Sequence, residues 1–137
     1  VGFVWVQGGG DMKNVTVAKE YLDNLKSLVA AVRKDTGVPD LPFLCGSMRR
    51  TDDPDDLSDL TPKRIGGPYP GIQWVVKAQW DAQKAIPNTH TVILRDIKKH
   101  PMNVHYDTEG QLEVGKLFAK EFLLMTKPSA DGKSAPR

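Results

Sequence analysis

The chain has 137 residues, of which 39% are hydrophobic and 26% charged, which is the composition of one globular domain. A formal net charge of +2, with acids and bases interspersed, excludes the basic stripe of a nucleic-acid-binding protein. No apolar run approaches the ~20 residues that cross a bilayer, and the single cysteine excludes an internal disulfide. We therefore expect neither nucleic acid nor a membrane as a partner, and the compartment stays undetermined.

The first half of the chain predicts two strands and a helix. Phe3–Gln7 is short, apolar and rich in aromatic and β-branched residues, which indicates a buried strand. Apolar residues at three- and four-residue spacing predict a helix over about 15–34, with Asn14 as its N-cap and Gly37 at its end. Leu41–Met48 is a second continuous apolar strand.

The second half predicts two helices and one strand. A polar loop over 49–71 leads to a helix over about 72–85, and His90–Asp96 is a third apolar strand. A last helix is expected from about Glu109 to Met125, with Thr108 and Gln111 forming a capping box. Residues 1–127 are expected to form a single α/β domain, and the polar tail 128–137 to be disordered.

Alternation of apolar strands with amphipathic helices predicts a parallel sheet covered by helices. In such sheets the ligand site lies at the carboxyl ends of the strands, so the segments 7–11, 47–50 and 96–107 should converge. At least one edge strand is apolar and unprotected by charge or proline, which predicts pairing with a partner chain or self-association. A start at Val1 inside a strand-like run suggests a fragment, a processed product or one half of a split protein, with the N-terminal strands missing.

The glycines in "WVQGGGD" raise the possibility of a phosphate loop, but the spacing opposes it. The third glycine of the dinucleotide fingerprint is Lys13, the P-loop ending is absent, and Asp11 would face any phosphate. A βα turn is the simpler interpretation. No cofactor is expected.

Metal ligands and nucleophiles are also poorly supported. The three histidines, His90, His100 and His105, lack metal-site spacing, and the acidic run 52–56 lacks that of a calcium loop. Cys45 is expected to be a buried apolar residue and Ser47 a structural serine. His105 precedes a capped helix at the ligand-binding end of the sheet, where a general base would lie; on position alone a surface histidine is favoured.

Four segments in register resemble one family. "VWVQGGGD" resembles the W-x-Q-G-E-x-D block of carbohydrate esterases of the SGNH-hydrolase superfamily, the sialate O-acetylesterase and acetylxylan esterase relatives. "LKSLVAAVRKDTGVPDLPFLCGSM" and "VVKAQWDAQKAIPNTHTVILRD" resemble the two helix–strand segments that follow it. "NVHYDTEGQLEVGKLFA" resembles the segment that carries the catalytic histidine, so the resemblance runs from residue 2 to about 122.

The resemblance implies a flavodoxin-like three-layer α/β/α fold and hydrolysis of acetyl esters on carbohydrates. His105 matches the catalytic base, and Gln7 matches the amide that helps to form the oxyanion hole. Both assignments are chemically reasonable, because an amide N–H can donate to a developing oxyanion and an imidazole can take a serine proton.

Three departures from the family bear on activity. The block with the nucleophilic serine has no counterpart in this chain, the position of the triad aspartate is Met102, and the glutamate of W-x-Q-G-E is Gly9. Asp107 and Asp96 are possible substitute acids, although helix capping is favoured for Asp107. Three hypotheses remain: part of an esterase that is inactive alone, an inactive member that binds carbohydrate or protein, and an unrelated α/β binding module.

Overall fold

The computed structural model describes residues 1–47, 69–99 and 105–127. The elements follow the predicted order, β1 (Phe3–Trp5), a 3-10 turn η1 (Asp11–Lys13), α1 (Val15–Thr36), β2 (Phe43–Ser47), α3 (Ile72–Ala85), β3 (Thr89–Ile93) and α4 (Thr108–Thr126). Residues 48–68, which include most of the predicted polar loop over 49–71, and the predicted tail over 128–137 lie outside the described residues.

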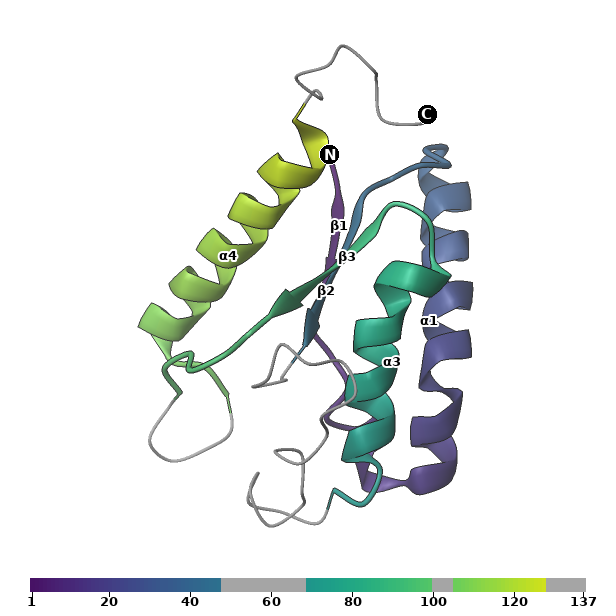
Figure 1. Cartoon of the computed structure of the whole chain (residues 1–137), viewed down its shortest axis with the longest axis vertical. Helices are drawn as coiled ribbons and strands as arrows, with labels where there is room; N and C mark the ends of the chain where they lie inside the picture. Colours follow the sequence, from purple (N-terminus) through teal and green to yellow (C-terminus); the bar gives the residue numbers. More distant parts are fainter. Residues whose placement is uncertain (48–68, 100–104, 128–137) are drawn as a thin grey trace.

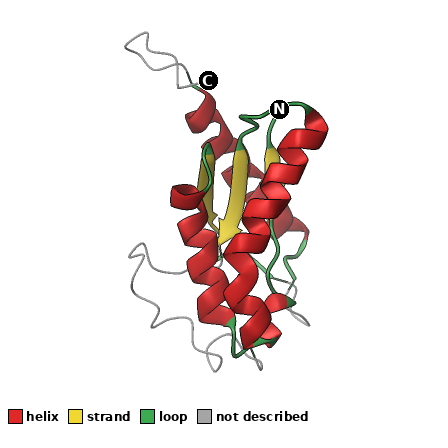
Figure 2. Cartoon of the chain, turned by 90° about the vertical axis from the view of Figure 1, so that its right-hand side faces the viewer, coloured by secondary structure: helices red, strands yellow, loops and turns green. Residues whose placement is uncertain are grey.

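The three strands form one parallel sheet in the order β1-β2-β3. Helices α1 and α3 cover one face and α4 covers the other, which gives three layers (Figure 1). Figure 2 shows the strands behind the paired helices. The prediction of an α/β fold with a parallel sheet is therefore confirmed, and the arrangement is consistent with a flavodoxin-like SGNH-type fold in which part of the domain is present.

Alternate residues of β2 supply the two faces of the core. Phe43 and Cys45 pack among α1 and α3, whereas Leu44 packs against α4, and all three are fully buried. The apolar stripes of both later helices face the sheet. In α3 and the residue after it, the buried residues at helical spacing are Ile72, Val75, Val76, Ala82 and Ile86. Phe118 of α4 is buried, and its remaining stripe packs against that cluster: Val114, Leu117, Phe122 and Met125.

The strands are shorter than predicted at their ends. β1 ends at Trp5 and β3 at Ile93, although the Leu94 N–H still donates to the Ser47 carbonyl at 2.8 Å. After β1 the chain turns at Gly8, whose φ of 146° is a conformation that essentially only glycine adopts. A side chain there would also meet Val75 Cγ1 at 2.7 Å. Apolar composition alone does not show where such a turn interrupts a strand.

The start of α4 differs from the predicted capping box. Its N-cap is Asp107, whose carboxylate accepts the Gly110 N–H at 2.8 Å, and the Gln111 side chain donates instead to the Tyr106 carbonyl. Thr108 is therefore the first helical residue and not the cap. Both Asp and Thr are good N-cap residues, so the sequence alone does not decide which of the adjacent residues 107 and 108 caps the helix. For α1, the predicted Asn14 cap and left-handed Gly37 are confirmed.

Arg33, near the end of α1, joins the amino-terminal ends of β2 and β3. Its guanidinium donates to the Leu41 carbonyl ahead of β2 and, at 2.7 Å, to the Pro87 carbonyl ahead of β3. Bonds from a charged donor are stronger than neutral ones. One side chain thus fixes the sheet at the end opposite to the carboxyl ends of the strands.

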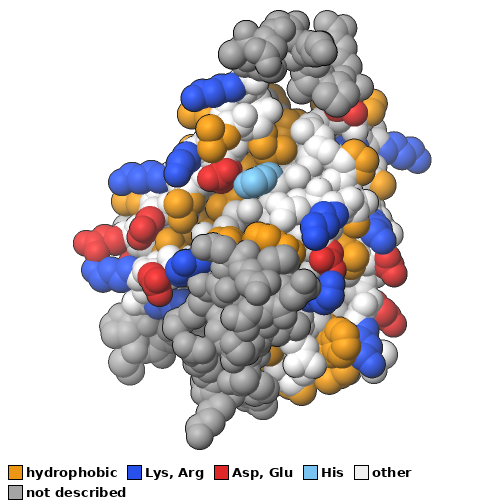
Figure 3. All heavy atoms as spheres, in the orientation of Figure 1, with side chains coloured by type: hydrophobic (Ala, Val, Ile, Leu, Met, Phe, Trp, Pro, Cys, Tyr) orange, Lys and Arg blue, Asp and Glu red, His pale blue; other side chains and the backbone are white. Residues whose placement is uncertain are grey.

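Within the described residues, no helix combines the length and apolarity needed to cross a membrane. Acidic and basic side chains are interspersed over the face seen in Figure 3, as the sequence composition predicted.

Candidate active site

Two of the three segments predicted to converge, 7–11 and 96–107, line one hollow; the segment 47–50 contributes no lining residue, and its residues 48–50 lie outside the described part of the chain. The hollow has a volume of about 320 Å³ and lies where the chain leaves the strands. The turn after β1 contributes Gln7 and the glycines 8–10, the segment after β3 contributes Leu94 and Lys99, and the segment before α4 contributes His105 and Tyr106. Gln7 and His105, the two residues assigned by resemblance, therefore face the same hollow although they are far apart in sequence.

The backbone of Gln7 is held by two side chains. Its carbonyl accepts the Tyr21 hydroxyl from α1 at 2.8 Å and the Gln79 amide from α3 at 2.9 Å. The Trp5 indole donates in turn to the Tyr21 oxygen at 3.2 Å. Both helices on one face of the sheet therefore fix the position at which the chain turns into the hollow.

The side chain of Gln7 is oriented by an acid four residues later. Its Nε2 donates to Asp11 Oδ2 at 2.9 Å, and an amide nitrogen carries a second N–H. Asp11 opens η1, where the Met12 N–H donates to the Gly8 carbonyl. The compact turn thus brings the Asp11 carboxylate to the Gln7 amide. A negative charge at this position would repel a phosphate, so the turn is unsuited to phosphate binding.

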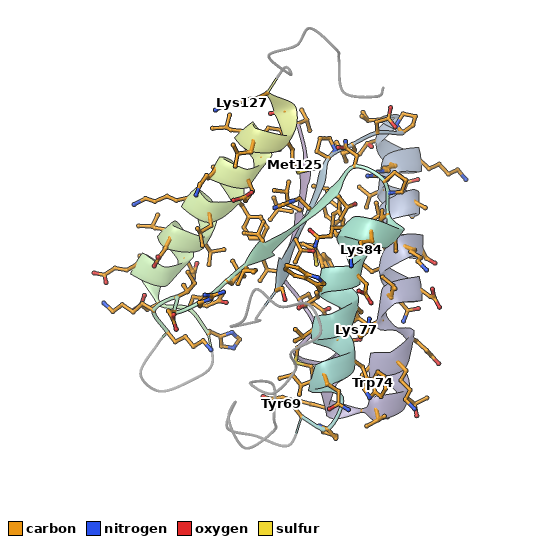
Figure 4. The ribbon with its side chains drawn as sticks, viewed as in Figure 1. Tyr69, Trp74, Lys77, Lys84, Met125 and Lys127 are labelled. Carbon is orange, nitrogen blue, oxygen red and sulfur yellow. The ribbon has the colours of Figure 1, made fainter. Side chains whose placement is uncertain are left out.

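The turn is further anchored to the start of α3. The Gly71 N–H donates to the Met12 carbonyl at 2.8 Å, and a side chain at Gly71 would meet Ala18 Cβ at 2.5 Å. Figure 4 shows Tyr69 and Trp74 at this end of α3, with Met125 on the sheet side of α4. The Lys19 ammonium lies 5.3 Å from the Trp74 ring centre, which joins α1 to α3 at the same end.

His105 lies in a segment held from both sides. The next residue, Tyr106, forms an antiparallel bridge with Lys99, and its carbonyl accepts from Gln111 of α4. Burial raises the pKa of the Tyr106 hydroxyl, so that group stays protonated at neutral pH. His105 itself is exposed. The arrangement presents an accessible imidazole beside a rigid helix start.

The two candidate substitute acids occupy different environments. Asp107 caps α4 through one oxygen, and its other oxygen lies 3.6 Å from Lys98 Nζ. Lys98 also pairs with Glu109. Asp96 is exposed in a left-handed backbone conformation, with φ of 53°. Neither lines the hollow, and Met102, at the position of the family's triad acid, lies outside the described residues.

The other candidates have structural environments. Cys45 and Ser47 are fully buried in β2, and His90 of β3 lies 3.2 Å from Glu121 of α4. Burial raises the pKa of the Cys45 thiol to about 12, which leaves it unreactive near neutral pH. Among the described residues, no cluster of three or more His, Cys, Asp and Glu could hold a metal ion. His100 lies outside those residues.

Two contributors to the site were missed from the sequence. Tyr21 and Gln79 occupy inward positions of amphipathic helices, where an aromatic or polar residue is normally interpreted as packing. Gln79 is only 1% exposed, and its Oε1 atom has no hydrogen-bond partner among the described residues. A glutamine in an otherwise apolar stripe was the available signal, because a buried amide needs polar partners.

The buried Tyr21 and Cys45 predict a loss of stability in alkaline solution. Burial raises the pKa of Tyr21 from 10.0 to about 12, and that of Cys45 from 9.0 to about 12. Above pH 9 the unfolded chain therefore loses protons that the folded chain retains, so the free energy of unfolding falls by about 1.4 kcal/mol per pH unit for each ionising group. Urea denaturation at pH 8–11.5 measures this slope.

The variant Cys45→Ala separates the two groups. Its stability should start to fall about one pH unit later than that of the parent, because the buried groups that remain, Tyr21 and Tyr106, ionise in the unfolded chain only near pH 10.0. Identical pH dependences for the two proteins would contradict the assignment to Cys45.

Comparison with known proteins supports the resemblance. The family model for carbohydrate esterase, sialic acid-specific acetylesterase, matches residues 1–124. A crystal structure of an Arabidopsis thaliana protein superposes with a TM-score of 0.68 at 24% sequence identity. That match covers 90% of this chain but 44% of the Arabidopsis chain, so this chain spans less than half of its length. No curated protein matches the sequence.

Proposed function

Because the chain belongs to the carbohydrate esterase family of sialic acid-specific acetylesterases, we propose that it supplies the general base and an oxyanion donor for hydrolysis of acetyl esters on sugars. The observation that carries the proposal is the shared hollow. Gln7, two residues after β1, and His105, before α4, line the same cavity of about 320 Å³.

The chemistry follows from the roles of the two side chains. The nucleophile would be a serine on a segment of SGNH type outside this sequence. The His105 imidazole takes the serine proton as the oxygen attacks the acetyl carbonyl, and returns it to the departing sugar oxygen. Water then releases acetate from the acyl-enzyme by the same base. The Gln7 N–H that does not bind Asp11 is suited to donate to the oxyanion.

Because the base and the oxyanion donor lie in this chain and the serine would lie outside it, we predict that the 137-residue chain alone is inactive. Serine esterase chemistry requires a reachable nucleophile, and Ser47 is fully buried. Purified chain and buffer should therefore hydrolyse an aryl acetate at the same rate. Turnover that His105→Ala abolishes would contradict the prediction and point to a nucleophile within the chain, with Ser47 the first to test.

Removal of the Gln7 amide should weaken catalysis once a serine-bearing segment is present. Gln7→Leu is expected to lower kcat about 10²–10³-fold with a smaller change in KM, because an oxyanion donor acts mainly in the transition state. Gln73→Leu, at an exposed position of α3, is the matched control. Equal losses in the two variants would assign the effect to folding.

Asp11 offers a test of how the amide is held. Asp11→Asn keeps the shape and an acceptor oxygen but removes the charge that strengthens the bond from Gln7 Nε2. We expect a smaller loss of kcat than for Gln7→Leu. A loss larger than that of Gln7→Leu would mean that Asp11 has a role of its own.

An inactive family member that binds carbohydrate or protein is the second candidate. It is favoured by Met102 and Gly9 at positions where the family has acids. A thioether cannot orient an imidazole or stabilise imidazolium. Met102→Asp in the serine-bearing protein tests this candidate: a gain in rate identifies the missing acid, whereas no gain indicates that more than the acid has been lost.

A further inference from the structure

The N–H of Gly8 has no hydrogen-bond partner among the described residues. The Gly8 carbonyl accepts the Met12 N–H at 3.1 Å, but the Gly8 nitrogen donates to no oxygen in the part of the chain that the structure describes. Gly8 is buried and lines the hollow of about 320 Å³. A buried backbone N–H is almost always paired with protein, water or a ligand. The hollow is therefore the place where a partner of this N–H would lie.

Two side chains fix the direction of the peptide group that joins Gln7 and Gly8. The Gln7 carbonyl accepts the Tyr21 hydroxyl at 2.8 Å and the Gln79 Nε2 at 2.9 Å, which together use both lone pairs of the oxygen. No peptide bond of the described residues is cis, and in a trans peptide the N–H points away from the carbonyl. The Gly8 N–H therefore points away from α1 and α3, the helices that carry Tyr21 and Gln79.

The donors that hold the Gln7 carbonyl cannot exchange roles with it. The Trp5 indole can only donate, and it donates to the Tyr21 oxygen at 3.2 Å, so the Tyr21 proton is directed to the carbonyl. Burial raises the pKa of Tyr21 to about 12, so the hydroxyl keeps this proton at neutral pH. A carbonyl can only accept, so the Gln79 amide must present Nε2 and not Oε1. Reversal of the peptide would leave two buried donors unpaired, which is costly.

Packing alone does not explain a glutamine at position 79. The other buried residues of α3 are all apolar, namely Ile72, Val75, Val76, Ala78 and Ala82. The Gln79 Oε1 atom has no hydrogen-bond partner among the described residues, and an unpaired buried acceptor destabilises a fold. An apolar side chain of the same length would fill this position without that cost. The contribution of the amide is therefore its bond to the Gln7 carbonyl, which orients the peptide.

The hollow thus receives two N–H donors from adjacent residues. One N–H of the Gln7 side chain binds Asp11, and the other is suited to donate to an oxyanion, as proposed above. Acyl-transfer sites stabilise the oxyanion with backbone N–H groups and side-chain amides that are fixed before the reaction. Building on the proposed esterase function, we infer that the Gly8 N–H is a second donor to the oxyanion of the tetrahedral intermediate. Tyr21 and Gln79 are the positioning residues that direct it into the hollow.

Kinetics of the serine-bearing protein test the two positioning residues. Tyr21→Phe removes only the hydroxyl, and Gln79→Met removes the amide but keeps an unbranched side chain that fills a core well. Each should lower kcat about 10-fold, and the double variant about 10²-fold, because a donor that is no longer directed stabilises the transition state less. KM should change by less than about 2-fold, since the oxyanion forms only after substrate binding. Gln73→Met, at an exposed position of α3, is the matched control and should leave kcat unchanged.

A boronic acid tests the Gly8 N–H directly. Methylboronic acid bonds through boron to the serine oxygen, the serine proton passes to His105, and the tetrahedral boronate carries the negative charge that an oxyanion would carry. In the ¹⁵N-labelled serine-bearing protein, the Gly8 amide proton should move downfield when the adduct forms, because it gains a charged acceptor. The amide protons of Gly9 and Gly10, which are exposed, should shift less. In the double variant Tyr21→Phe, Gln79→Met the shift of Gly8 should be smaller than in the parent.

The two readouts separate this inference from the proposed function. An unshifted Gly8 amide in the adduct would overturn the inference even if His105→Ala and Gln7→Leu lowered the rate as proposed. Unchanged kcat in both positioning variants, or an equal loss in Gln73→Met, would do the same. A Gly8 amide that shifts in a protein without acetyl ester turnover would support the donor and contradict the proposed function. Circular dichroism checks folding, and if one positioning variant does not fold, the other variant and the Gly8 shift in the parent decide.

Discussion

Replacing His105 by alanine is expected to lower kcat/KM for acetyl ester hydrolysis about 10²–10⁴-fold in an esterase that combines this chain with a serine-bearing segment. The reason is that the imidazole would transfer a proton in both half-reactions, and no other histidine among the described residues lines the hollow. Initial rates on an acetylated sugar, measured as acetate release, give the size of the effect.

The matched control for this prediction is His90→Ala. His90 lies in β3 and pairs with Glu121 of α4, away from the hollow that His105 lines. Its loss should change kcat/KM by less than about 3-fold. Removal of this partly exposed ion pair costs little stability and touches no residue that lines the hollow. A similar loss in both variants would indicate a general effect on folding, and an unchanged rate in His105→Ala would remove His105 from the mechanism.

Replacing Phe43 by alanine is expected to lower the free energy of unfolding by about 3–5 kcal/mol. Phe43 is 0% exposed at the start of the central strand, and its ring centre lies 5.3 Å from that of Phe3. Truncation opens a cavity between the sheet, α1 and α3 that backbone movement cannot close, because β2 is paired on both sides. Urea denaturation followed by circular dichroism measures the change.

Leu112→Ala is the control for the core substitution. Leu112 belongs to α4 but is 63% exposed, so its truncation should change the free energy of unfolding by less than about 0.5 kcal/mol. If the Phe43 variant lost as little as this control, Phe43 would not be central to the core.

Periodicity and strand composition predicted the order of the elements because these patterns report burial directly. The three- and four-residue spacing of Ile72, Val75 and Val76 is that of a helix with one buried face. The ends of elements were less predictable. The turn at Gly8 depends on where neighbouring helices and loops pack, which local sequence does not contain. Capping by Asp107 was favoured from the sequence and is confirmed, whereas the capping box at Thr108 and Gln111 was wrong by one residue.

The candidate site was predictable in part. Gln7 and His105 were assigned by resemblance to sequence blocks, and strand polarity predicted that their segments would meet. Tyr21 and Gln79 could not be assigned, because their contribution is a contact with the Gln7 carbonyl across the fold. Helical periodicity gives the face on which a side chain lies but not the backbone atom that it will contact.

The bonds of Arg33 have a consequence for changes in loop length. They anchor the chain ahead of β2 and β3 at the end of the sheet that carries no candidate site. Insertions and deletions at the opposite end can therefore alter the hollow without shifting these two strands relative to one another. The shape of the candidate site and the spacing of β2 and β3 are thus set by separate parts of the chain.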